Sequence, residues 1–168
     1  MVYIESSRCK KLRRVICGMF IVIGYMLSTT FAYAYIETEG EGIFVHMTAL
    51  NLAFGNPGSD TPMYRNTLYG VIYILLPFIG FLFTFFDHKS NVKNYVSIVC
   101  GIIGCSSIAL PIGFNPELTP GIGAITSIFL YTAVTSLSAI SVLFKIQEQR
   151  AANKDKPVET SPRLGRHV

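Results

Sequence analysis

The chain has 168 residues, of which 51% are hydrophobic and only 14% are charged, with 14 Lys and Arg against 10 Asp and Glu. Soluble domains average about 25% charged residues, so this composition disfavours a disordered chain and an ordinary soluble enzyme domain. The charges are also confined to certain segments, which predicts an integral membrane protein.

Four long stretches contain no Asp, Glu, Lys, Arg or His, and they cover residues 15–36, 67–86, 95–114 and 121–144. A helix of about 20 residues rises roughly 30 Å, which matches the thickness of the hydrocarbon core. Backbone polar groups must be paired internally in lipid, so the spans should be helical. The sequence therefore predicts an all-α fold, an integral membrane four-helix bundle whose membrane domain covers residues 15–146.

A basic segment, residues 1–14, precedes the first span and contains Arg8, Lys10, Lys11, Arg13 and Arg14. This layout also resembles that of a signal peptide, because the apolar stretch ends in an A-x-A sequence at residues 32–34. The apolar stretch is longer than the 7–15 residues of a usual signal-peptide core. We therefore favour a retained membrane span over a cleaved leader.

The connection between the first two spans, residues 37–66, is too long for a bare turn in a compact bundle. Four apolar residues recur in it at helical spacing, namely Ile43, Met47, Leu50 and Phe54. We predict a short amphipathic helix on the outer surface of the membrane. These four residues form either a docking surface for a partner or a lid over the helix ends, and the sequence does not separate the two.

The third span carries a ladder of small residues spaced four apart: Ser97, Gly101, Cys105, Ala109 and Gly113. Small residues at this spacing let another helix approach closely in lipid. The ladder could contact a partner subunit or pack within the protein's own bundle, and we favour the second interpretation.

The fourth span carries seven Ser and Thr hydroxyls: Thr126, Ser127, Thr132, Thr135, Ser136, Ser138 and Ser141. At about 100° per residue they fall nearly all round the helix, which argues against a single water-lined stripe. This distribution favours a helix that has neighbours on several sides.

Positive charge is distributed asymmetrically between the connections. Lys and Arg dominate the first 14 residues, the turn after the second span and the polar tail 147–168, whereas the first and third connections are acidic. The positive-inside rule then puts both termini in the cytoplasm. We predict a multi-pass protein of the cell (plasma) membrane with its N- and C-termini inside.

The sequence offers no set of residues typical of catalysis or cofactor binding. The three His residues lie outside the spans, and there is no pair of outer-loop thiols and no phosphate-binding glycine motif. We therefore predict no enzymatic activity, no cofactor, no metal site and no nucleic-acid partner. The expected partners are the lipid bilayer and other membrane protein subunits or a second copy. The protein would serve as an accessory or stabilising subunit of a membrane complex, with a small oligomeric transporter or channel as the alternative.

Overall fold

The computed structural model describes residues 7–29, 33–37, 43–54, 67–86, 91–114 and 118–154. In chain order they form α1 (Ser7–Thr29), β1 (Tyr33–Glu37), β2 (Ile43–Met47), α2 (Ala49–Phe54), α3 (Thr67–Phe86), α4 (Val92–Phe114), β3 (Leu118–Pro120) and α5 (Ile122–Lys154). Four of these helices are long and apolar enough to cross a membrane, with candidate spans Arg8–Thr29, Leu68–Phe86, Val92–Phe114 and Ile122–Gln147. The predicted four-helix membrane bundle is thereby confirmed in its number of candidate spans.

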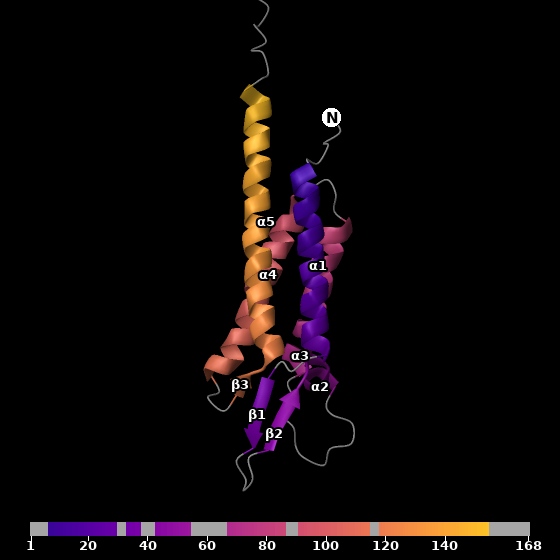
Figure 1. Ribbon diagram of the computed structural model, residues 1–168, viewed down its shortest axis with the longest axis vertical. Helices are drawn as coiled ribbons and strands as arrows, with labels where there is room; N and C mark the ends of the chain where they lie inside the picture. The colour runs from indigo at the N-terminus through magenta and orange to yellow at the C-terminus, as the bar shows by residue number, and fades with distance from the viewer. Residues whose placement is uncertain are drawn as a thin grey trace, which may run out of the picture.

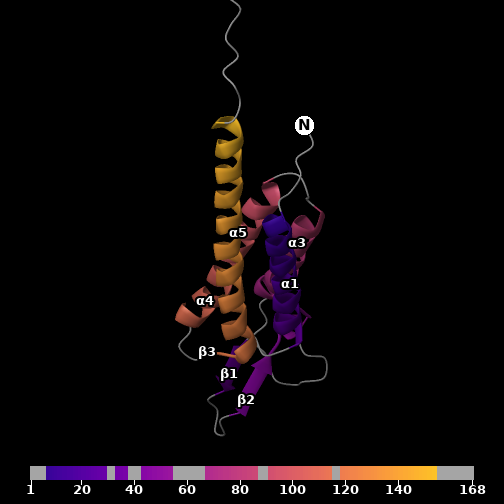
Figure 2. The ribbon, with the colours of Figure 1, turned by 45° about the horizontal axis from the view of Figure 1, so that its top comes forward.

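The four long helices form a ring in which α1 packs on α3 and α5, and α4 packs on α3 and, most extensively, on α5. The start of α1 and the end of α5 lie at the same end of the bundle, and the sheet lies at the opposite end (Figures 1 and 2). Helix α5 has 33 residues, or about 50 Å of helix, and it projects beyond the other helices (Figure 1).

A small antiparallel sheet, which the sequence analysis did not predict, joins two separate connections of the bundle. Its strand order is β2-β1-β3, with Tyr33 paired to Met47 and to Pro120, and Tyr35 paired to Leu118. The strands β1 and β2 are rich in aromatic and β-branched residues, which favour extended backbone. Proline is tolerated in β3 because β3 is an edge strand.

The structure corrects two predicted boundaries at this end. The first long helix runs from Ser7 to Thr29, so the predicted span 15–36 was wrong at its C-terminal end, where Tyr33–Glu37 pair as β1. The predicted amphipathic helix over 43–54 was also wrong in extent. Only Ala49–Phe54 are helical, and Ile43–Met47 form β2. In residues 33–37 and 43–47, hydrogen bonding between the strands replaces the helical conformation that the local sequence pattern predicts.

The apolar core is centred on one face of α1. Ile16, Phe20, Ile23 and Leu27 are each at most 2% exposed, and their spacing is that of a single helical face. A Cβ on Gly80 of α3 would overlap the ring of Phe20. Glycine at this position therefore allows α1 and α3 to approach closely.

Candidate functional site

The first part of the small-residue ladder faces the other helices of the bundle. Gly101 is buried against Tyr131 and Thr135 of α5, because a Cβ on it would lie 3.0 Å from the Tyr131 carbonyl oxygen and would overlap the Thr135 hydroxyl. The Cys105 thiol lies 3.6 Å from the Ile128 carbonyl oxygen. These contacts place Gly101 and Cys105 in the α4–α5 interface.

Ser97, the first member of the ladder, contacts α3. The hydroxyls of Thr84 and Ser97 lie 3.1 Å apart. Since Thr84 Oγ1 already donates to the Gly80 carbonyl at 2.7 Å, the Ser97 hydroxyl is the donor to Thr84. This member of the ladder therefore fixes α4 against α3 through a hydrogen bond within the bundle.

The last two members of the ladder, Ala109 and Gly113, remain exposed on α4. A Cβ on Gly113 would have no atom within 4 Å. Both residues line a groove of about 370 Å³, which we call the α4–α5 groove; its other lining residues are Ile112, Pro120, Ile125, Ile128 and Phe129. The groove lies between the end of α4 and the start of α5 and includes Pro120 of β3. Figure 2 shows that the two helices diverge there. The ladder thus continues from an occupied interface into an open apolar groove.

The predicted outer-loop contact is divided between two elements. Ile43 and Met47 belong to β2, and Leu50 and Phe54 belong to α2. Helix α2 buries Ala49, Leu52 and Ala53, while Leu50 and Phe54 are 43% and 73% exposed. Leu50 and Phe54 therefore remain available as one exposed apolar pair beside α3.

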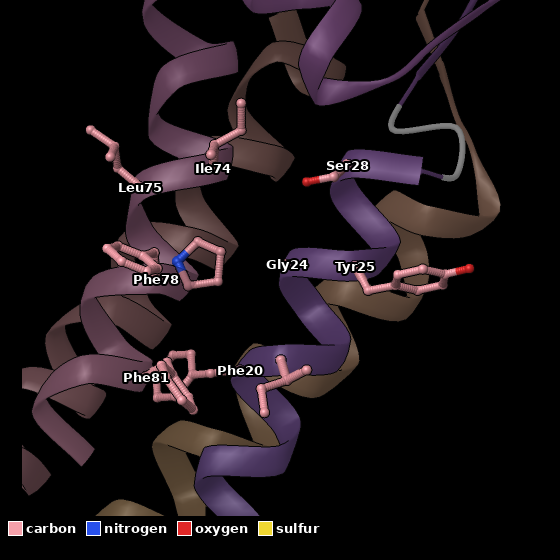
Figure 3. A pocket seen from close by; sticks show the side chains of 10 residues that line it. Phe20, Gly24, Tyr25, Ser28, Ile74, Leu75, Phe78 and Phe81 are labelled. Atoms are coloured by element: carbon pink, nitrogen blue, oxygen red, sulfur yellow. The ribbon is translucent and has the colours of Figure 1, made fainter. Parts of the chain in front are cut away.

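A second groove, of about 330 Å³, lies between α1 and α3, and Figure 3 shows it from close by. Its wall includes the aromatic rings of Phe20 from α1 and of Phe78 and Phe81 from α3. The Ser28 hydroxyl points toward α3, whereas the Tyr25 hydroxyl points away from it (Figure 3). The wall is almost entirely apolar, which suits hydrocarbon better than a polar solute.

The buried face of α5 is polar, a feature that sequence reasoning missed. Ser127, Tyr131 and Ser138 are fully buried, and Ser141 and Lys145 are at most 4% exposed. The sequence analysis considered only the Ser and Thr residues of this helix, which are distributed all round it, and did not include Tyr131. The polar face was therefore not recognised. The spacing of four, seven, three and four between these five residues is the signal that could have found it.

Cationic residues gather at the end of the bundle opposite the sheet. In the described part of the chain, every Lys and Arg lies in the first turns of α1, at the start of α4 or toward the end of α5. Two of these residues, Lys93 and Lys145, are only 2% and 3% exposed. Long basic side chains at helix ends commonly pack their stems against apolar surface.

The described residues contain no group of three or more His, Cys, Asp or Glu side chains that could hold a metal ion. The four cysteines, Cys9, Cys17, Cys100 and Cys105, form no disulfide among the described residues. The contacts between helices described above are close packing at glycines and hydrogen bonding between hydroxyl groups.

The fold and its four candidate spans define the class as a multi-pass helical membrane protein. No known protein family model matches the chain, and no curated protein matches it.

Proposed function

We propose that the protein is non-enzymatic and acts by association, as an accessory or stabilising subunit of a larger membrane complex. The α4–α5 groove would seat a transmembrane helix of another membrane protein. The observation that carries this proposal is the continuity of the ladder. Its residues Gly101 and Cys105 already hold a helix of this chain, and Ala109 and Gly113 continue the same turning stripe, where no described atom lies within 4 Å of a Cβ on Gly113.

The physics of helix association in lipid supports this choice. Lipid tails are as apolar as leucine, so helices associate through close packing and hydrogen bonds rather than through the hydrophobic effect. The small residues Ala109 and Gly113 in this groove would let the backbone of a partner helix approach α4 closely. The exposed Phe129, which is 72% exposed and lines the same groove, adds a large apolar contact.

The proposal includes an orientation and a location. The cationic end of the bundle, which contains the start of α1 and the end of α5, would face the cytoplasm under the positive-inside rule. The sheet and α2 would then face outward from the plasma membrane, and Leu50 and Phe54 would form a second contact with the partner outside the bilayer. The burial of Ala49, Leu52 and Ala53 supports α2 as a fixed platform for that contact.

The test is to isolate tagged protein from its native membrane in mild detergent and identify what co-purifies. Gly113→Leu should fill the groove and abolish co-purification. The matched control is Gly18→Leu, because Gly18 of α1 is also a helical glycine with no atom within 4 Å of a Cβ. Both variants should remain folded, since a Cβ at either position meets no atom within 4 Å among the described residues.

Equal co-purification with both variants would refute the groove as the contact. Failure of the unaltered protein to retain any membrane protein would refute association as the function. Gly101→Leu is unsuitable for this experiment, because its side chain would displace Thr135 within the bundle and disturb folding as well as assembly.

A further inference from the structure

The hydroxyls of α5 fall into two groups that differ in their hydrogen bonding. Thr132, Thr135 and Ser136 each donate to the carbonyl oxygen four residues earlier, at 2.8–2.9 Å. Ser127 and Ser138, which are fully buried, make no such bond, and no other partner lies within reach in the described part of the chain. These three hydroxyls, which are not fully buried, are therefore satisfied by their own helix, and the two fully buried serines are not.

Tyr131 belongs with the buried serines. Its hydroxyl is fully buried and also has no hydrogen-bond partner among the described residues. At about 100° per residue, Ser127, Tyr131 and Ser138 lie within about 40° of one another around α5. The three hydroxyls are thus directed to the same side of the helix, the side that faces the bundle interior.

Helix α4 covers this side of α5. A Cβ on Gly104 would lie 2.6 Å from the Tyr131 ring, and Cys105 contacts Ile128. Extending this antiparallel register toward the start of α4 brings Asn94 level with the turn of α5 that contains Ser138 and Ser141. Asn94 is 4% exposed, and its Nδ2 also has no partner among the described residues.

Four buried polar atoms without partners among the described residues would be costly in any protein interior. Ser127, Tyr131 and Ser138 also lie inside the candidate span Ile122–Gln147, where they cannot turn to bulk solvent. Ser127 and Ser138 could satisfy themselves by bonding to their own backbone, as three neighbours on the same helix do. Their directed orientation toward the interior therefore points to a partner held there.

We propose that the bundle binds ordered water at two internal sites: the Ser138 site, formed by Asn94 and Ser138, and the Tyr131 site, formed by Ser127 and Tyr131. Water fits these groups because it can accept a hydrogen bond from Asn94 Nδ2 and can either donate to or accept from the hydroxyls. Val134, fully buried on the same face of α5, separates the two sites. This inference does not depend on the proposed association.

Water-edited solid-state NMR in lipid bilayers tests the proposal directly, using protein with labelled Ser, Val and Asn. Magnetisation from water should reach the Cβ atoms of Ser127 and Ser138 earlier than it reaches the Cβ atom of Ser136, whose hydroxyl faces lipid. It should also reach these two serines earlier than it reaches the side chain of Val134. Equal or later arrival at Ser127 and Ser138 would overturn the proposal, and this measurement needs no variant.

A matched pair of variants then tests the composition of the Ser138 site. Ser138→Ala should cause loss of the transfer from water to the Asn94 side-chain amide, because one of the groups that hold the water is removed. Ser136→Ala should leave that transfer intact. Unchanged transfer in Ser138→Ala would show that Asn94 receives it from bulk water at the bundle end, which contradicts a shared site.

Discussion

Gly104→Ala tests the tight contact between α4 and α5 most directly. A Cβ at this position would lie 2.6, 2.6 and 2.7 Å from three carbons of the Tyr131 ring. Ordinary carbon–carbon contacts are about 3.5–4.0 Å, so the ring and the helix backbone would have to separate by about 1 Å. The ring cannot simply rotate aside, because Tyr131 is fully buried.

The expected cost follows from two opposing effects. Overpacking a well-packed core costs about 1–3 kcal/mol, while replacing glycine by alanine within a helix returns up to about 1 kcal/mol of helix propensity. Gly113→Ala supplies the matched control, since that Cβ meets nothing within 4 Å. Gly113 stands next to the last residue of α4 and shares only part of the propensity gain, so the difference between their free energies of unfolding should be at most the steric cost, about 1–3 kcal/mol.

The assay is reversible unfolding in mixed micelles, in which the fraction of denaturing detergent is increased and helicity is monitored. Gly104→Ala should unfold at a lower denaturant fraction than Gly113→Ala. Adding Tyr131→Leu should reduce the penalty, because the branched side chain lacks the ring carbons and the two sites are in contact. Equal stability of Gly104→Ala and Gly113→Ala would refute the close α4–α5 approach.

Two further substitutions test the remaining contacts. Gly70→Ala should displace α2, because the new Cβ would lie 2.7 Å from the Cα of Ala53; amide hydrogen exchange in α2 should accelerate, and unchanged exchange would contradict this docking. Tyr73→Phe removes the hydroxyl that donates to the Ser107 carbonyl at 2.7 Å. It should cost about 0.6 kcal/mol, the average for such bonds in membrane bundles, in the same unfolding assay, and an unchanged or increased stability would count against that hydrogen bond.

The membrane helices were predictable because exclusion of charge over about 20 residues has a direct physical cause. The predicted bounds of α3 match the structure, and α4 ends where predicted. The N-terminal bound of α1 and the C-terminal bound of α5 differ because a helix can continue beyond its charge-free stretch, where charged side chains reach water. The segment Ser7–Arg14 and the residues after Phe144 are helical although they carry charges.

The sheet was not predictable from local pattern. Ile43, Met47, Leu50 and Phe54 have the spacing of one helical face, yet the first two lie in β2. The pairing of β1 with β3 joins connections that are far apart in the sequence, with α2, α3 and α4 between the two strands. Pairing between such distant segments follows from the packing of the bundle, which brings the connections to the same end.

The small-residue ladder was predictable as a helix contact, but its occupant was not. One-dimensional spacing places Ser97 through Gly113 along one gradually turning stripe. This spacing does not predict where along α4 the helix α5 separates from it. The structure shows α5 on the Gly101 part and an open groove at Gly113, so the partner contact at Ala109 and Gly113 stays a prediction.

The two halves of the bundle are held together by different means, which bears on how the protein can associate. Helix α1 contributes large apolar side chains to the interior, and Phe20 packs on Gly80 of α3. Helices α4 and α5 instead bury hydroxyls and bring their backbones close at Gly101 and Gly104. In lipid, close packing and hydrogen bonding drive association where the hydrophobic effect does not. Our proposal that a partner helix packs at Ala109 and Gly113 follows from the same physics, because it would extend the close packing at Gly101 and Gly104 along α4.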